Sequence, residues 1–185
     1  MKKAKWIWHF GDFECLHLKK VNYRRTEREY PFPPFWKQPE IYSCVRFRKE
    51  IEIEKAETIT VYAKGKGFVT VGEERYPFET PIMVEKGKYL IEVLLCNENG
   101  LPCIFVQGDT VVSDESWECC TFDTYKKAGC NDKYTSVSDD PNVFKFSYEK
   151  LMPVTMKKLQ NGALYDFGEE TLAVLKVIDT IEPFT

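Results

Sequence analysis

Residues 44–54 carry the clearest structural signal, and they read Cys-Val-Arg-Phe-Arg-Lys-Glu-Ile-Glu-Ile-Glu. Apolar side chains recur at Val45, Phe47, Ile51 and Ile53, and charged residues fill the positions between them. Successive side chains of a strand point to opposite faces, so this alternation predicts a half-buried β-strand. A strand with one solvated face is typical of an antiparallel sheet.

Further short strands are predicted on both sides of this one. Turn sequences such as Lys64-Gly65-Lys66-Gly67 and Asn97-Glu98-Asn99-Gly100 separate them. Leu90 and Leu94 add apolar residues to the second face of one strand, which we therefore expect to be central and covered on both faces. The expected strands cover residues 44–54, 59–63, 68–71, 82–84, 89–95, 104–106, 162–168 and 172–178.

Many short strands without a long helical period predict an all-β protein. We expect an antiparallel β-sandwich or jelly roll over residues 44–185. Residues 1–43 are expected to form an irregular, extended segment that packs on the sandwich, with a short strand at Trp6-Ile7-Trp8. Prolines at 31, 33 and 34 exclude a helix there. A proline-rich signalling ligand is the alternative, but the neighbouring aromatic residues favour packing.

The length and composition are those of a folded domain. The chain has 185 residues, 13 Phe, 10 Tyr and 4 Trp, which suffice for a full core. A net charge of −3 provides no field that would attract polyanions, and the basic stretch at 19–25 is followed at once by Glu27 and Glu29. A solvated loop explains this stretch better than nucleic-acid binding, so we expect no nucleic-acid partner.

The cysteines and histidines do not form a recognisable metal site. Seven cysteines occur without a Cys-x-x-Cys pair, and the only histidines are His9 and His17. We therefore expect free thiols in a reducing compartment, with no metal and no cofactor. Asp139-Asp140 is a weak hint of calcium binding, since exposed acidic turns are common.

The N-terminus does not fit a signal peptide. It starts with basic residues, but His9 and the pair Gly11-Asp12 interrupt any apolar run. No stretch approaches the roughly 20 apolar residues that span a bilayer. We expect a cytoplasmic location and no membrane partner.

The segment from Ile104 to Trp117 is the strongest candidate for a ligand contact. It places Asp114, Glu115 and Trp117 just past a predicted strand. Adjacent carboxylates on an extended segment point apart and do not make the separated pair of a glycosidase, so we assign no catalytic residue. Neither histidine fits a nucleophile arrangement, and no glycine-rich nucleotide signature occurs.

Sugar binding is the ligand chemistry that these residues would suit. Sugars stack on flat aromatic faces and are oriented by a few polar groups. The candidates are Trp36, Asp114 and Trp117, with the region of Tyr125 and Tyr134 in addition. The alternative is that these aromatic side chains seal the ends of the sandwich.

Four segments resemble bacterial α-L-rhamnosidases of glycoside hydrolase family 78. Ser113-Asp114-Glu115-Ser116-Trp117 is similar to their Thr-Asp-x-Ser-Trp turn, and Tyr165-Asp166-Phe167-Gly168-Glu169-Glu170 is similar to their Tyr-Asp-Phe-Gly-x-Glu strand entry. The opening at 4–8 and the strand at 45–49 also match the way such chains begin. The likeness spans nearly the whole chain in the right order.

The resemblance implies a non-catalytic β-sandwich of the galactose-binding-like kind that precedes a large (α/α)₆ barrel. In that family the barrel carries the general acid and the base of an inverting hydrolysis, so no catalytic residue transfers to this chain. The end at Thr185, directly after a predicted strand, favours a fragment cut at a domain boundary.

Three functions follow as hypotheses. The first is an accessory domain of an α-L-rhamnosidase-like enzyme, inactive alone, that supports the barrel and contacts rhamnose-containing glycan. The second is a free-standing carbohydrate-binding module that uses Trp117 or Trp36 with Asp114. The third is a protein-interaction sandwich.

Overall fold

The computed structural model describes residues 3–17, 43–121, 124–147 and 149–168. The chain divides into two compact units, Met1–Lys145 and Phe146–Thr185, and each is described by itself. Sequence reasoning placed no boundary at residue 146. The predicted division after residue 43 borders residues 18–42, which lie outside the described part, and it stays a prediction.

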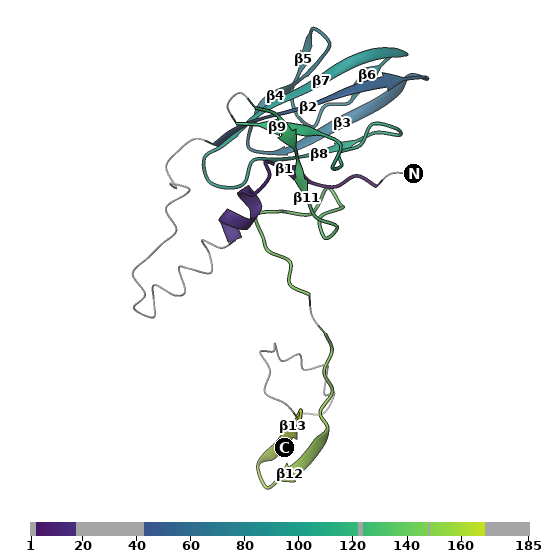
Figure 1. Ribbon diagram of the computed structural model, residues 1–185. Coiled ribbons are helices and arrows are strands. Elements are labelled where there is room, and N and C mark those ends of the chain that lie inside the picture. The colour runs from purple at the N-terminus through teal and green to yellow at the C-terminus, as the bar shows by residue number, and fades with distance from the viewer. Residues whose placement is uncertain (1–2, 18–42, 122–123, 148, 169–185) are drawn as a thin grey trace, which may run out of the picture. The chain divides into compact units, whose positions relative to one another are not determined.

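The first unit is a sandwich of two antiparallel sheets (Figure 1). The six-stranded sheet has the order β10 (Lys126–Lys127), β9 (Glu118–Cys120), β2 (Ser43–Ile53), β7 (Gly87–Asn97), β4 (Lys66–Val71) and β5 (Glu74–Tyr76). The five-stranded sheet has the order β11 (Gly129–Cys130), β1 (Ile7–Trp8), β8 (Cys103–Gln107), β3 (Glu57–Lys64) and β6 (Ile82–Val84). The predicted sandwich is confirmed, whereas the jelly-roll order stays a prediction.

The longest ladder joins β2 to β7 and confirms the alternation in the sequence. Its register runs from Ser43 opposite Asn97 to Ile53 opposite Gly87. Val45 and Phe47 are fully buried between the sheets, whereas Arg46 is exposed. The central position of β7 is confirmed, but the expectation that both of its faces are covered is wrong at Leu90, which is 38% exposed.

Two apolar cores lie on opposite sides of the five-stranded sheet. β8 separates them, because Ile104 and Val106 belong to the core between the sheets, whereas Cys103 and Phe105 face the other way. The second core gathers seven buried residues: Trp6, Trp8, Phe13, Leu101, Cys103, Phe105 and Tyr134. The first residues of the chain therefore help to cover the outer face of this sheet.

A helix follows β1 and includes residues 12–17, although an irregular segment was expected there. Phe13 on this helix stacks on Trp8 with 4.7 Å between ring centroids, and this contact joins the helix to β1. Within the described ranges, no helix is both long and apolar enough to cross a bilayer.

The second unit contains a hairpin of β12 (Thr155–Leu159) and β13 (Gly162–Asp166). β13 confirms most of the strand predicted at 162–168. Its partner was not predicted, and the strand expected at 172–178 lies outside the described residues. Large apolar side chains remain exposed on this hairpin: Val154, Met156, Leu159, Leu164 and Tyr165.

The expectation of seven free thiols is wrong for two of them. A disulfide joins Cys44 to Cys96 across the β2–β7 ladder. Cys15, Cys103, Cys119, Cys120 and Cys130 are free. Sequence spacing gave no sign of the pair, because the two cysteines are 52 residues apart and meet only through strand register. The cytoplasmic location stays a prediction.

Candidate functional site: the Val111–Trp117 turn

The turn that connects β8 to β9 is anchored at its start by a buried carboxylate. Glu57, the first residue of β3, accepts hydrogen bonds from the Thr110 amide at 2.7 Å, the Thr110 hydroxyl at 2.8 Å and the Val111 amide at 3.1 Å. Gly108 lets the chain close on itself, because a Cβ there would lie 2.8 Å from the Val111 carbonyl oxygen. Together they fix the entry of the turn.

Ser113 joins this turn to the N-terminal segment. Its fully buried hydroxyl accepts a hydrogen bond from the Val106 amide at 2.9 Å and donates one to the Lys5 carbonyl at 2.6 Å. The Lys5 amide in turn donates to the Ser113 carbonyl at 2.8 Å. Ser113 therefore satisfies backbone groups of β8 and of the N-terminal segment.

Asp114 shapes the turn from within. Its Oδ1 accepts hydrogen bonds from the Ser116 amide at 2.9 Å and from the Ser116 hydroxyl. The Trp117 amide donates to the Asp114 carbonyl at 3.2 Å. A carboxylate that binds its own backbone two residues on is the Asx turn that aspartate favours in tight loops.

Trp117 belongs to the core between the sheets. Its side chain is 0% exposed, and the indole Nε1 donates to the Val112 carbonyl at 2.9 Å. A buried indole normally finds a partner for its single donor, as this one does within the turn. The ring therefore presents no open face on which a sugar could stack in this structure.

A lysine on the core-facing side of β2 completes the arrangement. Lys49 Nζ lies 3.5 Å from Asp114 Oδ1 and donates to the Val112 carbonyl at 3.4 Å. It also lies 5.8 Å from the centroid of the Trp117 ring. The charge of Asp114, only 5% exposed, is thus balanced by Lys49.

Lys5 links the tip of the turn to the residues after β11. Its ammonium lies 2.8 Å from Asp132 Oδ1 and 3.5 Å from Glu115 Oε2. The hydrogen bond to Asp132 raises the pKa of Lys5 and lowers the pKa of Asp132. The pKa of Glu115 is lowered chiefly by its own backbone amide and then by Lys5.

The two tyrosines named as additional sugar contacts are not open platforms. The Arg48 guanidinium covers the ring of Tyr125 at 3.6 Å from the centroid and pairs with Glu118 at 3.0 Å. Burial is the main cause that raises the pKa of Tyr125. Tyr134 is buried, and its hydroxyl donates to the Val143 carbonyl at 2.9 Å.

The structure brings Asp114 and Trp117 together in one turn, whereas Trp36 lies outside the described residues. Glu57, Lys49 and Ser113 were missed. Only Lys49 left a signal in the sequence, because it places a charge in the apolar register of β2. The sugar-binding role of Trp36, Asp114 and Trp117 stays a prediction.

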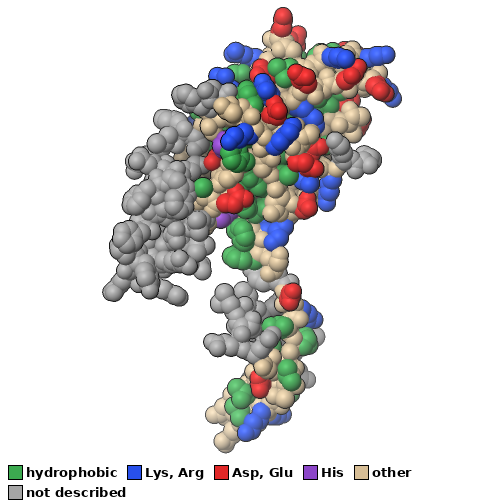
Figure 2. All heavy atoms as spheres, viewed as in Figure 1, with side chains coloured by type: hydrophobic (Ala, Val, Ile, Leu, Met, Phe, Trp, Pro, Cys, Tyr) green, Lys and Arg blue, Asp and Glu red, His purple; other side chains and the backbone are tan. Residues whose placement is uncertain are grey.

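The residues suggested for calcium make other contacts. Asp139 accepts hydrogen bonds from Lys145 Nζ at 2.5 Å and from the Ser136 amide at 2.9 Å. Asp140 accepts from the amide of Asn142 at 3.0 Å. Over the described residues, no three His, Cys, Asp or Glu side chains are grouped as a metal site would need. On the face that Figure 2 shows, acidic and basic side chains are interspersed over the first unit.

Two antiparallel sheets around a common core, closed by a turn whose polar groups bind one another, define a β-sandwich module. The chain belongs to the family described as "Alpha-rhamnosidase-like, bacteroidetes, N-terminal", whose model matches residues 45–181. The resemblance seen in the sequence is thereby confirmed.

Two solved structures are similar to this chain. The first is the α-L-rhamnosidase from Dictyoglumus thermophilum, at 18% identity and a TM-score of 0.43, with 89% of this chain and 25% of that chain covered. The second is the Streptomyces avermitilis α-L-rhamnosidase complexed with L-rhamnose, at 15% identity and a TM-score of 0.35, with 74% and 15% covered. The chain spans a quarter or less of either. No curated protein matches the chain.

Proposed function

We propose that this chain is an accessory β-sandwich domain of an α-L-rhamnosidase-like glycoside hydrolase. In this role it performs no chemistry alone and supports a catalytic (α/α)₆ barrel in the same enzyme. The observation that carries the proposal is the family match over residues 45–181, which spans most of both sheets and the hairpin of the second unit.

The burial of the turn and its hydrogen bonds within the same chain support a structural role for this segment. Its carboxylate, hydroxyl and indole are buried and bind groups of the same chain. A catalytic acid must reach the bond that it protonates, and a stacking platform must offer a free face. Asp114 and Trp117 instead hold β9 against the rest of the sandwich.

The hairpin of the second unit supports the proposal of a partner domain. Its strands place Met156 opposite Tyr165 on one face and Lys157 opposite Leu164 on the other. Met156 is 62% exposed, and Val154, Leu159, Leu164 and Tyr165 are also exposed. An isolated two-stranded sheet is marginal in water, and clustered exposed apolar groups mark interaction surfaces. A neighbouring domain would cover them.

The test compares this chain with a longer reading frame from the same genome. We expect the isolated chain to give no turnover of an aryl α-L-rhamnoside, and a frame that continues into a helical barrel to give turnover. Turnover by the isolated chain that Asp114→Asn abolishes, while Asp109→Asn in the same loop does not, would refute the proposal.

The same protein tests the carbohydrate-binding alternative. Titration with rhamnose-containing glycans is followed by calorimetry and by tryptophan fluorescence. Trp6, Trp8 and Trp117 are buried, so a fluorescence change without unfolding would make Trp36 the first residue to test by mutation. Saturable binding by a chain without turnover would support a binding module in place of a scaffold.

A further inference from the structure

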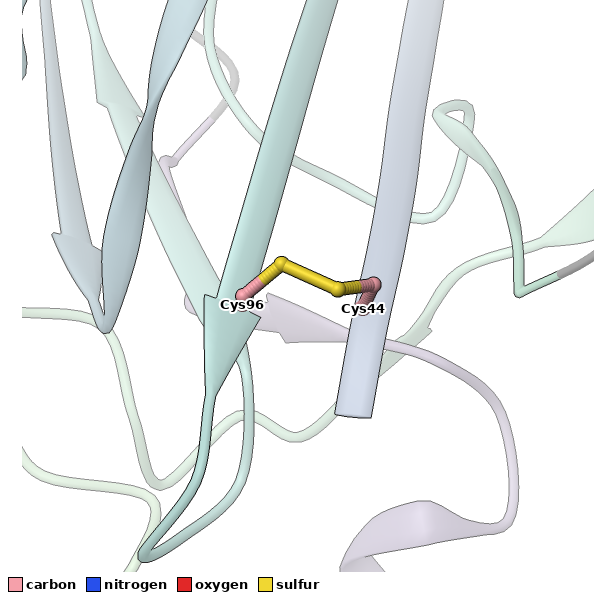
Figure 3. Close-up of a disulfide and its surroundings, with 2 residues drawn as sticks. All are labelled: Cys44 and Cys96. Atoms are coloured by element: carbon pink, nitrogen blue, oxygen red, sulfur yellow. A yellow bond between two sulfur atoms is a disulfide. The ribbon is translucent and has the colours of Figure 1, made fainter. Parts of the chain in front are cut away.

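The Cys44–Cys96 disulfide lies on the solvent side of the six-stranded sheet. Figure 3 shows it as a direct link between two neighbouring strands. Val45 and Leu95, the next residues on β2 and β7, are fully buried between the sheets. Since side chains alternate along a strand, both cysteines point away from the core, and each is only half buried. A dissolved thiol can therefore approach the bridge.

The bridge is not needed to pair the two strands. β2 and β7 are joined by a ladder of eleven register pairs, from Ser43–Asn97 to Ile53–Gly87. Asn97 holds the end of β7 independently, because its Nδ2 donates to the Lys64 carbonyl at 3.1 Å. The core between the sheets and the rest of the ladder would persist without the sulfur–sulfur bond.

The beginning of β2 depends on the bridge more than any other part of this ladder. β9 pairs with β2 only at Arg46, Phe47 and Arg48. Ser43, Cys44 and Val45 therefore have β7 as their one described strand partner. Cys96, in contrast, pairs with Cys44 on one side and with Lys66 of β4 on the other. Opening the bond would loosen the start of β2 and leave β7 in place.

We propose that Cys44 and Cys96 form a thiol–disulfide switch that controls the order of the first residues of β2. A dithiol reductant opens it in two steps. One thiolate attacks a sulfur of the bridge to form a mixed disulfide and releases the other cysteine, and the second thiol of the reductant then displaces the remaining cysteine. The protein gains two electrons and two protons, and the reductant becomes a cyclic disulfide. Lys66 is the β4 register partner of Cys96, and Arg46 follows Cys44 by two residues and so shares its face of β2.

The first test counts thiols in the whole chain. After equilibration with glutathione disulfide, alkylation in denaturant followed by intact mass should modify five cysteines. Treatment of the folded protein with dithiothreitol before alkylation should raise the count to seven. Seven modified cysteines in the oxidised sample would refute the switch. Five modified cysteines would also refute it if the folded protein had been treated with dithiothreitol before it was alkylated in denaturant.

The second test locates the structural change by hydrogen exchange. On reduction, exchange at residues 43–45 should accelerate by about tenfold or more, whereas exchange at residues 49–53 should stay slow. Cys44→Ser should reproduce the reduced pattern in the absence of reductant, and Cys15→Ser should leave the oxidised pattern intact. Uniform acceleration over all of β2, or none at residues 43–45, would overturn the proposal.

Discussion

Lys49 Nζ lies 3.5 Å from Asp114 Oδ1, although Lys49 occupies a core-facing position of β2. Its neighbours in the same register, Phe47 and Ile51, are buried apolar residues. The carboxylate supplies the counter-charge that makes a lysine tolerable at this position. The pair joins the Val111–Trp117 turn to β2. The strand that follows this turn, β9, lies next to β2 in the same sheet.

Asp114→Ala should lower the free energy of unfolding by about 2 kcal/mol, because it leaves the Ser116 amide and Lys49 without their shared acceptor. Asp114→Asn keeps an acceptor oxygen and should cost less. Urea unfolding followed by tryptophan fluorescence measures both. Asp109→Ala, at an exposed position of the same loop, is the control and should be close to neutral.

Ser113→Ala should destabilise the fold by about 1–3 kcal/mol, since the buried Val106 amide loses its acceptor and the Lys5 carbonyl loses its donor. The N-terminal segment should also lose protection in hydrogen exchange. Ser138→Ala alters an exposed hydroxyl and serves as the matched control. Equal unfolding midpoints for the two variants would contradict the role assigned to Ser113.

The ion pairs of Lys5 should give stability a definite dependence on pH. The folded-state pKa values of Asp132 and Glu115 are lowered, so their contribution is present above the unfolded-state values and is lost as the pH falls through the folded-state values. The pKa of Lys5 is raised, so its contribution is present below its unfolded-state value and is lost as the pH rises through the folded-state value.

Lys5→Met should therefore lower the melting temperature near neutral pH and converge with the parent protein at both acid and alkaline extremes. Melting curves across the pH range at low salt measure this, because screening weakens exposed pairs. Lys88→Met removes a lysine that is more exposed and lies 3.6 Å from Glu52, and it should change the curves less. A constant offset at every pH would exclude the proposed ion pairs as the cause.

Removal of residues 146–185 should leave the sandwich folded. Every residue of both apolar cores lies within Met1–Lys145. The melting temperature should change by no more than about 4 °C, which corresponds to a loss of at most about 1 kcal/mol. The truncated chain should also be more soluble, because the exposed apolar residues of the hairpin are gone. Loss of cooperative unfolding would show that the second unit completes the core.

The sequence predicted the strands where one face is apolar and the other is charged. The alternation at residues 44–54 and the apolar run at Ile104–Val106 both became strands of the sandwich. β12 was missed because Thr155–Leu159 has no such alternation, and its structure comes from pairing with β13. The alternation of apolar and charged residues therefore predicted the fold class but not every strand.

The contacts of the turn depend on long-range pairing that one sequence does not encode locally. Asp114 and Trp117 were singled out correctly as members of one turn, but their burial depends on Lys49 and on the position of β2. Nothing in the sequence marks Glu57 and Ser113, because only the fold brings the buried amides that they bind within reach. The Cys44–Cys96 pair likewise follows from register and not from spacing.

β1 is an interior strand of its sheet, with β8 on one side and β11 on the other. Ile7 pairs with Ile104 and with Cys130, both of which leave the ribosome long after it. During synthesis Ile7 and Trp8 therefore lack their strand partners until residues 103–104 and 129–130 have been made. Such non-local pairing slows folding and leaves intermediates open to aggregation. β1 is made before both of the strands that flank it, so the five-stranded sheet cannot be completed until β11 has been made.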